Sequence, residues 1–420
     1  DHDRSGRYTC RDFGQNYLNS MDAKGNPVIF TNGDNDTFPL WYNQETEGVR
    51  TDARVCNLSY LQTDWYIDQM RRPAYDSPSL PISWTRLQYV TGTREGIPVQ
   101  PDALQQVIDY YKDSPEDLKQ MLGDNPYELK NIIRHWVLND NPDLQIFPTD
   151  SIVVTVDKEA VKRSGMMIAA DSIPDVMHIS LKGKRAVYKS EMMMLEMISQ
   201  ANWERPLYMS TTVGPDNYGH LGDNFVQEGL ACRITPFDTK QSGRTIDSER
   251  MYNNMMNKFK YGGLKENPDI YLDETVIRMC YTHRRLFNQL AQQLLKEGQK
   301  DKALKVLQRA EEEIPGSIVP HEAFYGHSLE LADAWLALGH KAEAEKLLNA
   351  VGQNAREYIE WYLSLNTQRL LQSSRECLMQ IYILNDIAKT WEPIDKKKAE
   401  TYRMEVNNYA SRCHQRGMSL

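Results

Sequence analysis

The change in sequence pattern near residue 265 constrains the fold more than any other feature. Before it, short β-branched runs alternate with helical stretches and with clusters of Pro, Asn, Asp and Gly, which is typical of an α/β domain. After it, almost every segment has helical periodicity. We therefore expect an α/β domain over residues 1–265, with a mostly parallel, Rossmann-like sheet, followed by an all-α domain over residues 266–420. Pro- and Ser-rich chain leading into short helices predicts a helical insertion at about 76–150.

The second domain carries an internal repeat. Tetratricopeptide repeats place small residues where two helices touch, a Gly at the turn and a Pro after the second helix. The segment 290–315 follows this pattern, and a second copy places Ala332 where the first has Ala291. The two alanines are further apart than the usual period of about 34 residues. We therefore predict tetratricopeptide-like repeats with an insertion around residues 316–322.

A strand, a helix and a second strand follow one another early in the first domain. Residues 27–30 and 53–58 predict the two strands. Between them we expect a helix with Asp36 or Thr37 as N-cap and Pro39 in its first turn, where the missing N–H costs nothing. So short a connection indicates a parallel βαβ unit.

Two later segments also predict local structure. The Met-rich helix at 190–202 is apolar nearly all round, so we expect it to be buried against the sheet. Residues 176–181 and 186–188 predict the two strands of a β-hairpin that turns at Lys182-Gly183-Lys184.

The polar loop after the first strand is the main candidate site. In open parallel sheets such loops lie at the carboxyl edge, where ligands bind. Carboxylates there suit a divalent cation or sugar hydroxyls, and neighbouring aromatic rings offer a stacking face; the sequence does not identify a metal. The candidate ligand-binding residues are Asn32, Asp34, Asn35, Asp36, Trp41, Tyr42, Asp64 and Arg71. The alternative is a structural turn in which Asp36 caps the helix and Trp41 enters the core.

Composition and missing motifs exclude several classes of function. The formal net charge of −9 argues against nucleic acid as a partner. No phosphate-binding glycine motif, nucleophile elbow or metalloprotease spacing is present, so we expect no cofactor and assign no catalytic residue. The six cysteines show no CxxC spacing, which leaves buried thiols and one or two disulfides both open.

Several long strings of this sequence resemble one protein family. They are RSGRYTCRDFGQNYLNS (4–20), FTNGDNDTFPLWY (30–42), TDWYIDQM (63–70) and NWERPLY (202–208), and the likeness continues at 251–259 and 271–275. The strings are similar to the soluble C-terminal region of bacterial multi-pass membrane proteins, formerly of unknown function and now grouped with membrane glycosyltransferases related to protein O-mannosyltransferases. The resemblance implies an N-terminal membrane part that uses a lipid-linked sugar donor, with this region on the periplasmic face of the inner membrane. The family's catalytic acidic residue belongs to that membrane part, so the resemblance gives Asp34 and Asp36 no catalytic role.

Three hypotheses follow. The first is a non-catalytic periplasmic accessory domain of a membrane-embedded glycosyltransferase, whose partners are its own membrane domain and a protein, peptide or glycan acceptor. The second is a self-contained, metal-assisted enzyme on a sugar or phosphate that uses Asp34 and Asp36. The third is a scaffold that positions the membrane part. The chain starts at Asp1 without an apolar leader, so we expect a mature form or an excised fragment.

Overall fold

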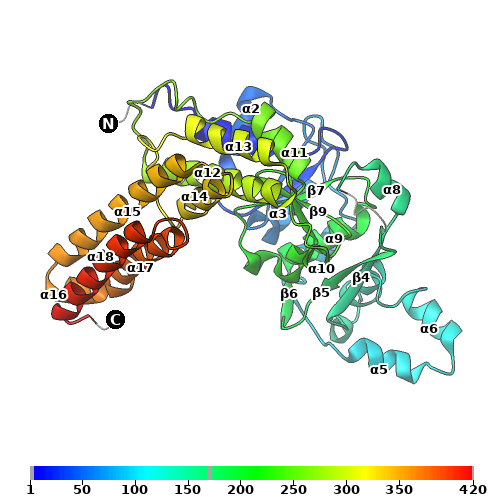
Figure 1. Cartoon of the computed structure of the whole chain (residues 1–420). Helices are drawn as coiled ribbons and strands as arrows, with labels where there is room; N and C mark the ends of the chain where they lie inside the picture. The colour runs from blue at the N-terminus through cyan, green and yellow to red at the C-terminus, as the bar shows by residue number, and fades with distance from the viewer. Residues whose placement is uncertain (1–3, 168–172, 419–420) are drawn as a thin grey trace. The chain divides into compact units, whose positions relative to one another are not determined.

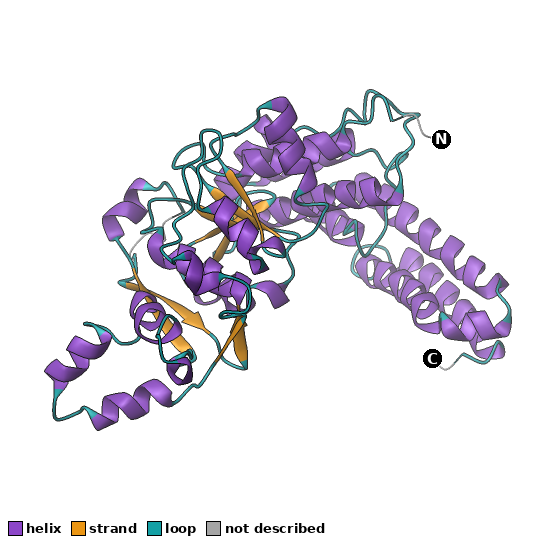
Figure 2. Cartoon of the chain, turned by 180° about the vertical axis from the view of Figure 1, so that it is seen from behind, coloured by secondary structure: helices purple, strands orange, loops and turns teal. Residues whose placement is uncertain are grey.

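A computed structural model describes residues 4–167 and 173–418 (Figure 1). Asp1, the expected cut edge, lies outside these ranges. The chain forms two compact units, one made by Arg11–Lys260 and the other by residues 4–10 together with Tyr261 and the chain that follows it. In Figure 2 the strands of the described residues all belong to the first, α/β unit, and the second unit is helical.

The α/β unit is built on a five-stranded sheet of order β2-β1-β7-β9-β8. The strands are β1 (Val28–Thr31), β2 (Arg54–Asn57), β7 (Leu207–Ser210), β8 (Phe225–Gln227) and β9 (Ala231–Ile234). β1 pairs in parallel with β2 and β7, but β9 pairs antiparallel with both β7 and β8. The sheet is therefore mixed rather than mostly parallel. Residues 228–230 join β8 to β9 and are too few for the crossover that a parallel pair needs.

The expected unit of strand, helix and parallel strand is confirmed at β1-α2-β2. Helix α2 (Phe38–Glu47) has Thr37 at the N-cap position and Pro39 in its first turn. Thr37 makes no side-chain capping bond; instead the Asp34 carbonyl accepts the N–H groups of Thr37 and Phe38 (3.3 and 3.0 Å). The helix ends at Gly48, whose φ of 62° is the left-handed conformation that favours glycine.

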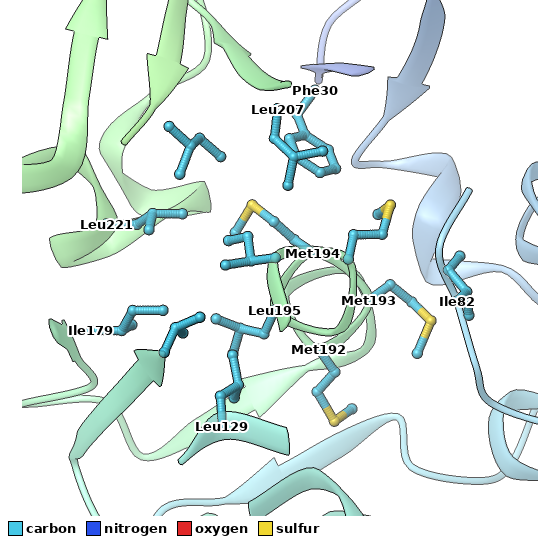
Figure 3. Packing of buried hydrophobic residues seen from close by; sticks show 14 of the residues in the cluster. Phe30, Ile82, Leu129, Ile179, Met192, Met193, Met194, Leu195, Leu207 and Leu221 are labelled. Carbon is cyan, nitrogen blue, oxygen red and sulfur yellow. The ribbon is translucent and has the colours of Figure 1, made fainter. Parts of the chain in front are cut away.

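The Met-rich helix α9 (Lys189–Gln200) is buried, as predicted. Figure 3 shows its methionines among side chains from the sheet and from the surrounding segments, including Phe30, Leu207 and Ile179. Unbranched Met side chains fill such irregular space well. Helix α9 is therefore a core element that supports the sheet.

The predicted hairpin around Lys182-Gly183-Lys184 is wrong. β5 (Val176–Ser180) pairs antiparallel with β4 (Ser151–Thr155), and β6 (Ala186–Tyr188) pairs antiparallel with β3 (Gly96–Pro98). Both strands pair with strands that come earlier in the chain and not with each other. The turn residues between β5 and β6 do not reveal these partners.

The other helices of the α/β unit lie before, between and after its strands. They are α1 (Thr9–Ser20), α3 (Asp64–Met70), α4 (Arg86–Tyr89), α5 (Ala103–Tyr110), α6 (Pro115–Leu122), α7 (Leu129–Ile132), α8 (Lys158–Arg163), α10 (Thr239–Ser242) and α11 (Ser248–Asn253). Within the stretch predicted as an insertion, α5 and α6 contribute to a small separate core of Leu104, Leu122, Trp136 and Ile146.

The helical unit consists of seven helices among its described residues. They are α12 (Glu274–Lys296), α13 (Lys300–Glu313), α14 (Ser328–Ala337), α15 (Lys341–Ser364), α16 (Thr367–Gln372), α17 (Ser374–Trp391) and α18 (Lys396–Gln415). The repeat alanines Ala291 and Ala332 are fully buried, and glycines with positive φ, Gly298 and Gly339, stand at the α12–α13 and α14–α15 turns. Residues 316–322 lie in the connection between α13 and α14.

Candidate functional site

The loop after β1 turns one of its two candidate carboxylates inward. Asp36 is 2% exposed. Its Oδ1 accepts the Gly33 N–H (2.9 Å), and its Oδ2 accepts the hydroxyls of Ser210 (3.1 Å) and Thr212 (2.8 Å). These hydroxyls also contact the hydroxyl of Tyr17, whose pKa is raised to about 12 by burial and by the charge of Asp36. Asp36 therefore ties the loop to the end of β7.

The other carboxylate points elsewhere. Asp34 and Asn35 are exposed, so the loop does not bring the carboxylates of Asp34 and Asp36 together as a pair facing solvent. Over residues 4–167 and 173–418, no group of three or more His, Cys, Asp or Glu side chains is arranged to hold a metal ion.

The carboxyl ends of β1 and β2 meet, as expected for neighbouring parallel strands. Asn57, the last residue of β2, donates to the Thr37 hydroxyl (2.9 Å) and to the Asn32 carbonyl (3.2 Å). The Asn32 side chain accepts the Ser59 hydroxyl (2.8 Å). Asn32 and Thr37 thus belong to a polar network that joins the two strand ends.

Asp64 and Arg71 lie at the two ends of α3 and are engaged with α4. Asp64 lies 3.7 Å from a guanidinium nitrogen of Arg86 and accepts the backbone N–H of Thr91 (3.3 Å). The Thr91 bond is the first cause that holds the pKa of Asp64 below its usual value. Arg71 donates to the Tyr89 hydroxyl (2.9 Å). These contacts fasten α4 to α3.

An aromatic cleft runs along the outer edge of β2, between α2 and α3. Its volume is about 440 Å³. Trp41 stacks on Tyr60, with ring centroids 6.1 Å apart and planes 9° apart, and Tyr60 also contacts Trp65. Trp65 is 55% exposed, and Tyr75, which also lines the cleft, is 61% exposed. We call this site the β2 cleft; its lining is Trp41, Gln44, Glu45, Ala53, Arg54, Val55, Tyr60, Trp65, Tyr66, Gln69, Met70, Ala74 and Tyr75.

Side chains already occupy backbone groups along the outer edge of β2. Gln44 donates to the Ala53 carbonyl (2.9 Å), and the Tyr66 hydroxyl accepts the Asn57 N–H (3.0 Å). The cleft therefore offers side-chain groups to a ligand. Its lining combines aromatic faces with two exposed polar residues, Gln69 and Glu45, and the Glu45 carboxylate accepts the Tyr75 hydroxyl. Apolar walls with a few polar groups are typical of small-molecule and peptide sites.

The structure separates the predicted site residues into distinct roles. Only Trp41 lines the β2 cleft; Tyr42 lies elsewhere on α2, 46% exposed, with its hydroxyl donating to Glu47 (3.2 Å). Sequence reasoning placed Trp65 after the second strand, near the same sheet edge, but missed Tyr60 and Tyr75 as cleft residues. The spacing of Tyr60 and Trp65 just after a predicted strand was a usable signal, but Tyr75 joins them only through the tertiary fold.

The helical unit has an aromatic groove of its own. Tyr271, Tyr325 and Tyr358 are 67%, 61% and 47% exposed, and they line a groove of about 550 Å³ with residues of α12, α15 and α17. The guanidinium of Arg278 lies over the Tyr325 ring, 5.5 Å from its centroid. Exposed tyrosines gathered on one concave surface are typical of protein interfaces.

Comparison with known families now identifies the chain. The family model for TMEM260-associated domain 2 matches residues 10–254, which is more than half of the chain and covers nearly the whole α/β unit. No curated protein and no solved structure matches the chain. Among the described residues, no helix has both the length and the apolar character needed to cross a membrane. The chain belongs to the TMEM260-associated domain 2 family, a family associated with membrane proteins.

Proposed function

We propose that the chain is a non-catalytic accessory region of a membrane-embedded, glycosyltransferase-like protein, and that it binds the acceptor. The proposal places it on the periplasmic face of the inner membrane, next to its own membrane domain. Its support is the membership in a membrane-protein-associated family together with the long sequence strings that resemble those transferases.

The β2 cleft is the observation that carries the binding role. The stacked rings of Trp41 and Tyr60 present flat apolar faces, and the exposed Trp65 extends them toward solvent. The apolar C–H face of a sugar ring packs on such surfaces, while hydroxyls hydrogen-bond to a carboxylate or an amide like those of Glu45 and Gln69. A glycan, or a peptide segment that carries one, fits this chemistry.

The helical unit supplies a second surface in this proposal. We take α12–α13 and α14–α15 to be tetratricopeptide-like pairs, and the parallel strands β2, β1 and β7 to be a Rossmann-like half-sheet. The groove lined by Tyr271, Tyr325 and Tyr358 would hold a peptide segment of the acceptor.

Calorimetric titration of the chain with mannohexaose, cellohexaose and a Ser/Thr-rich peptide tests the β2 cleft. We expect at least one of these probes to bind and Trp65→Ala to weaken its binding at least tenfold, which corresponds to about 1.4 kcal/mol. Tyr42→Ala is the matched control, because Tyr42 is an exposed aromatic residue (46%, against 55% for Trp65) on α2 that does not line the cleft. Tyr42→Ala should keep wild-type stability within about 0.5 kcal/mol. Trp65→Ala loses its ring contacts with Tyr60 and Tyr66 and should cost about 1–2 kcal/mol, with the α/β unit still folded. Binding of none of the probes, or equal weakening by both variants, would contradict the assignment.

One observation favours the scaffold hypothesis as the second candidate. The side chains of Asp36 and Asn57 form hydrogen bonds that hold loops in place, as expected of residues in a scaffold. In the full-length protein, a scaffold predicts that Trp65→Ala leaves glycosyl transfer to the acceptor unchanged. Acceptor binding predicts a raised KM for the acceptor with little change in kcat.

A further inference from the structure

Two cysteines face each other in the core of the helical unit. Cys377 belongs to the first turn of α17 and Cys413 to the last turn of α18. Their Sγ atoms are 3.9 Å apart, and both residues are fully buried. The sulfur atoms are thus in van der Waals contact across the interface of two packed helices.

This geometry is close to that of a bonded pair. A disulfide has an S–S distance of about 2.05 Å, so the two sulfur atoms must approach by about 2 Å. Both are held on helices that already pack together. Closing this gap requires rotations about the side-chain bonds and a small adjustment of the helices.

We propose that Cys377 and Cys413 form a disulfide when the chain folds in an oxidising environment. The oxidant is a disulfide compound of the glutathione or oxidoreductase class. One cysteine thiolate attacks the oxidant's disulfide, which forms a mixed disulfide and releases one thiol. The second thiolate then attacks the cysteine sulfur of the mixed disulfide, forms the Sγ–Sγ bond and releases the second thiol. The two cysteines lose two protons and two electrons, and the oxidant is reduced to two thiols.

The timing of the reaction follows from burial. Burial raises the pKa of Cys377 to about 12 and also raises the pKa of Cys413, and only the thiolate reacts. Because both residues are inaccessible once α17 and α18 pack, the bond forms before or during packing. The same burial protects it afterwards from reductants in solution.

The bond would join the last turn of α18 to the first turn of α17. The two residues are 36 positions apart, and the loop that they close contains the rest of α17 and nearly all of α18. The end of α18 is also held by Arg412, which donates to the Glu360 carboxylate (2.6 and 2.7 Å), and by Arg416, which donates to the carbonyls of Leu363 and Leu365 (both 2.7 Å). Helices fray from their ends, so a cross-link in the last turn of α18 opposes that route to unfolding.

Refolding of the whole chain with oxidised and reduced glutathione, followed by denaturation and alkylation without reductant, tests the inference. Trypsin cleaves after Arg375, Lys389, Arg412 and Arg416, so mass spectrometry should find residues 376–389 linked to 413–416. We expect the melting temperature of the helical unit to rise by on the order of 5–10 °C over the reduced chain. Cys413→Ala should abolish both effects, while Cys56→Ala, a buried cysteine on β2, should leave the linked peptide intact.

The result does not depend on the proposed function. Alkylation of both cysteines after oxidative refolding, or linkage of either one to a different cysteine, would overturn the inference. Because the mapping is done on the wild-type chain, it stays decisive even if a variant fails to fold.

Discussion

In the α/β unit Arg233 is 1% exposed and lies 3.7 Å from the carboxylate of Glu228, which is fully buried. In the helical unit, by contrast, the pairs that join α15 to α18 are partly exposed: Arg356 with Glu405 (2.9 Å) and Arg412 with Glu360 (2.6 Å). One unit keeps charge in its interior, and the other keeps these pairs at its surface.

Irregular backbone explains this difference. A helix satisfies its own N–H and C=O groups, whereas loops between strands need partners from side chains. Arg205 donates to the carbonyls of Asn26 and Ser79, and Arg54 donates to that of Arg72. The helical unit follows the same rule where its chain is irregular: the buried Arg284 donates to three carbonyls between α13 and α14, those of Ile314, Val319 and Pro320. Buried and half-buried arginines therefore mark places where side chains hold loops in position.

Breaking the interior charge cluster should have the largest effect. Arg233→Met takes a buried cation away from Glu228, which keeps Arg250 (3.6 Å) and the Tyr208 hydroxyl (2.9 Å) beside it, so we expect the α/β unit to lose about 3–5 kcal/mol of stability. Arg412→Met removes an exposed pair and should cost less than about 1 kcal/mol in the helical unit. Hydrogen exchange followed by mass spectrometry resolves the two units. Similar losses for the two variants would remove the contrast between the units.

Acidification should weaken the helical unit through His283. Burial lowers the pKa of this fully enclosed imidazole to about 3, against about 6.5 in the unfolded chain. As the pH falls, the unfolded state therefore binds the proton before the folded state does. The free energy of unfolding should drop by about 1.4 kcal/mol for each pH unit below 6.5, down to about pH 3. Denaturation of the wild type and of His283→Gln across this pH range measures the difference. A stability difference between them that does not change with pH would contradict the assignment.

The two carboxylates of the β1 loop should respond differently to the same change. Asp36→Asn weakens the bonds from Ser210 and Thr212 and should cost about 1–3 kcal/mol in the α/β unit. Asp34→Asn alters an exposed side chain and should cost less than about 0.5 kcal/mol. Urea denaturation of the two variants makes the comparison. A larger loss at Asp34 would mean that this exposed carboxylate has a role that the fold does not explain.

Local pattern was enough to predict the β1-α2-β2 unit and the burial of α9, because strand and helix periodicity and turn residues are local signals. It was not enough to predict which strands pair: β5 and β6 lie next to each other in sequence, yet they bond to β4 and β3. The candidate site shows the same limit. Loop polarity located Asp36, but its inward direction depends on Ser210 and Thr212, which lie far along the chain.

The side chains of Gln44 and Tyr66 along β2 have a consequence for the behaviour of the protein at high concentration. A bare edge strand recruits strands from other copies and leads to aggregation. Here the Gln44 amide is hydrogen-bonded to the Ala53 carbonyl and the Tyr66 hydroxyl to the Asn57 N–H. A strand from another molecule would need these backbone groups to pair with β2. The side chains that line the cleft thus also block strand pairing between neighbouring molecules at β2. The protein can therefore expose aromatic rings in this cleft without self-associating along that strand.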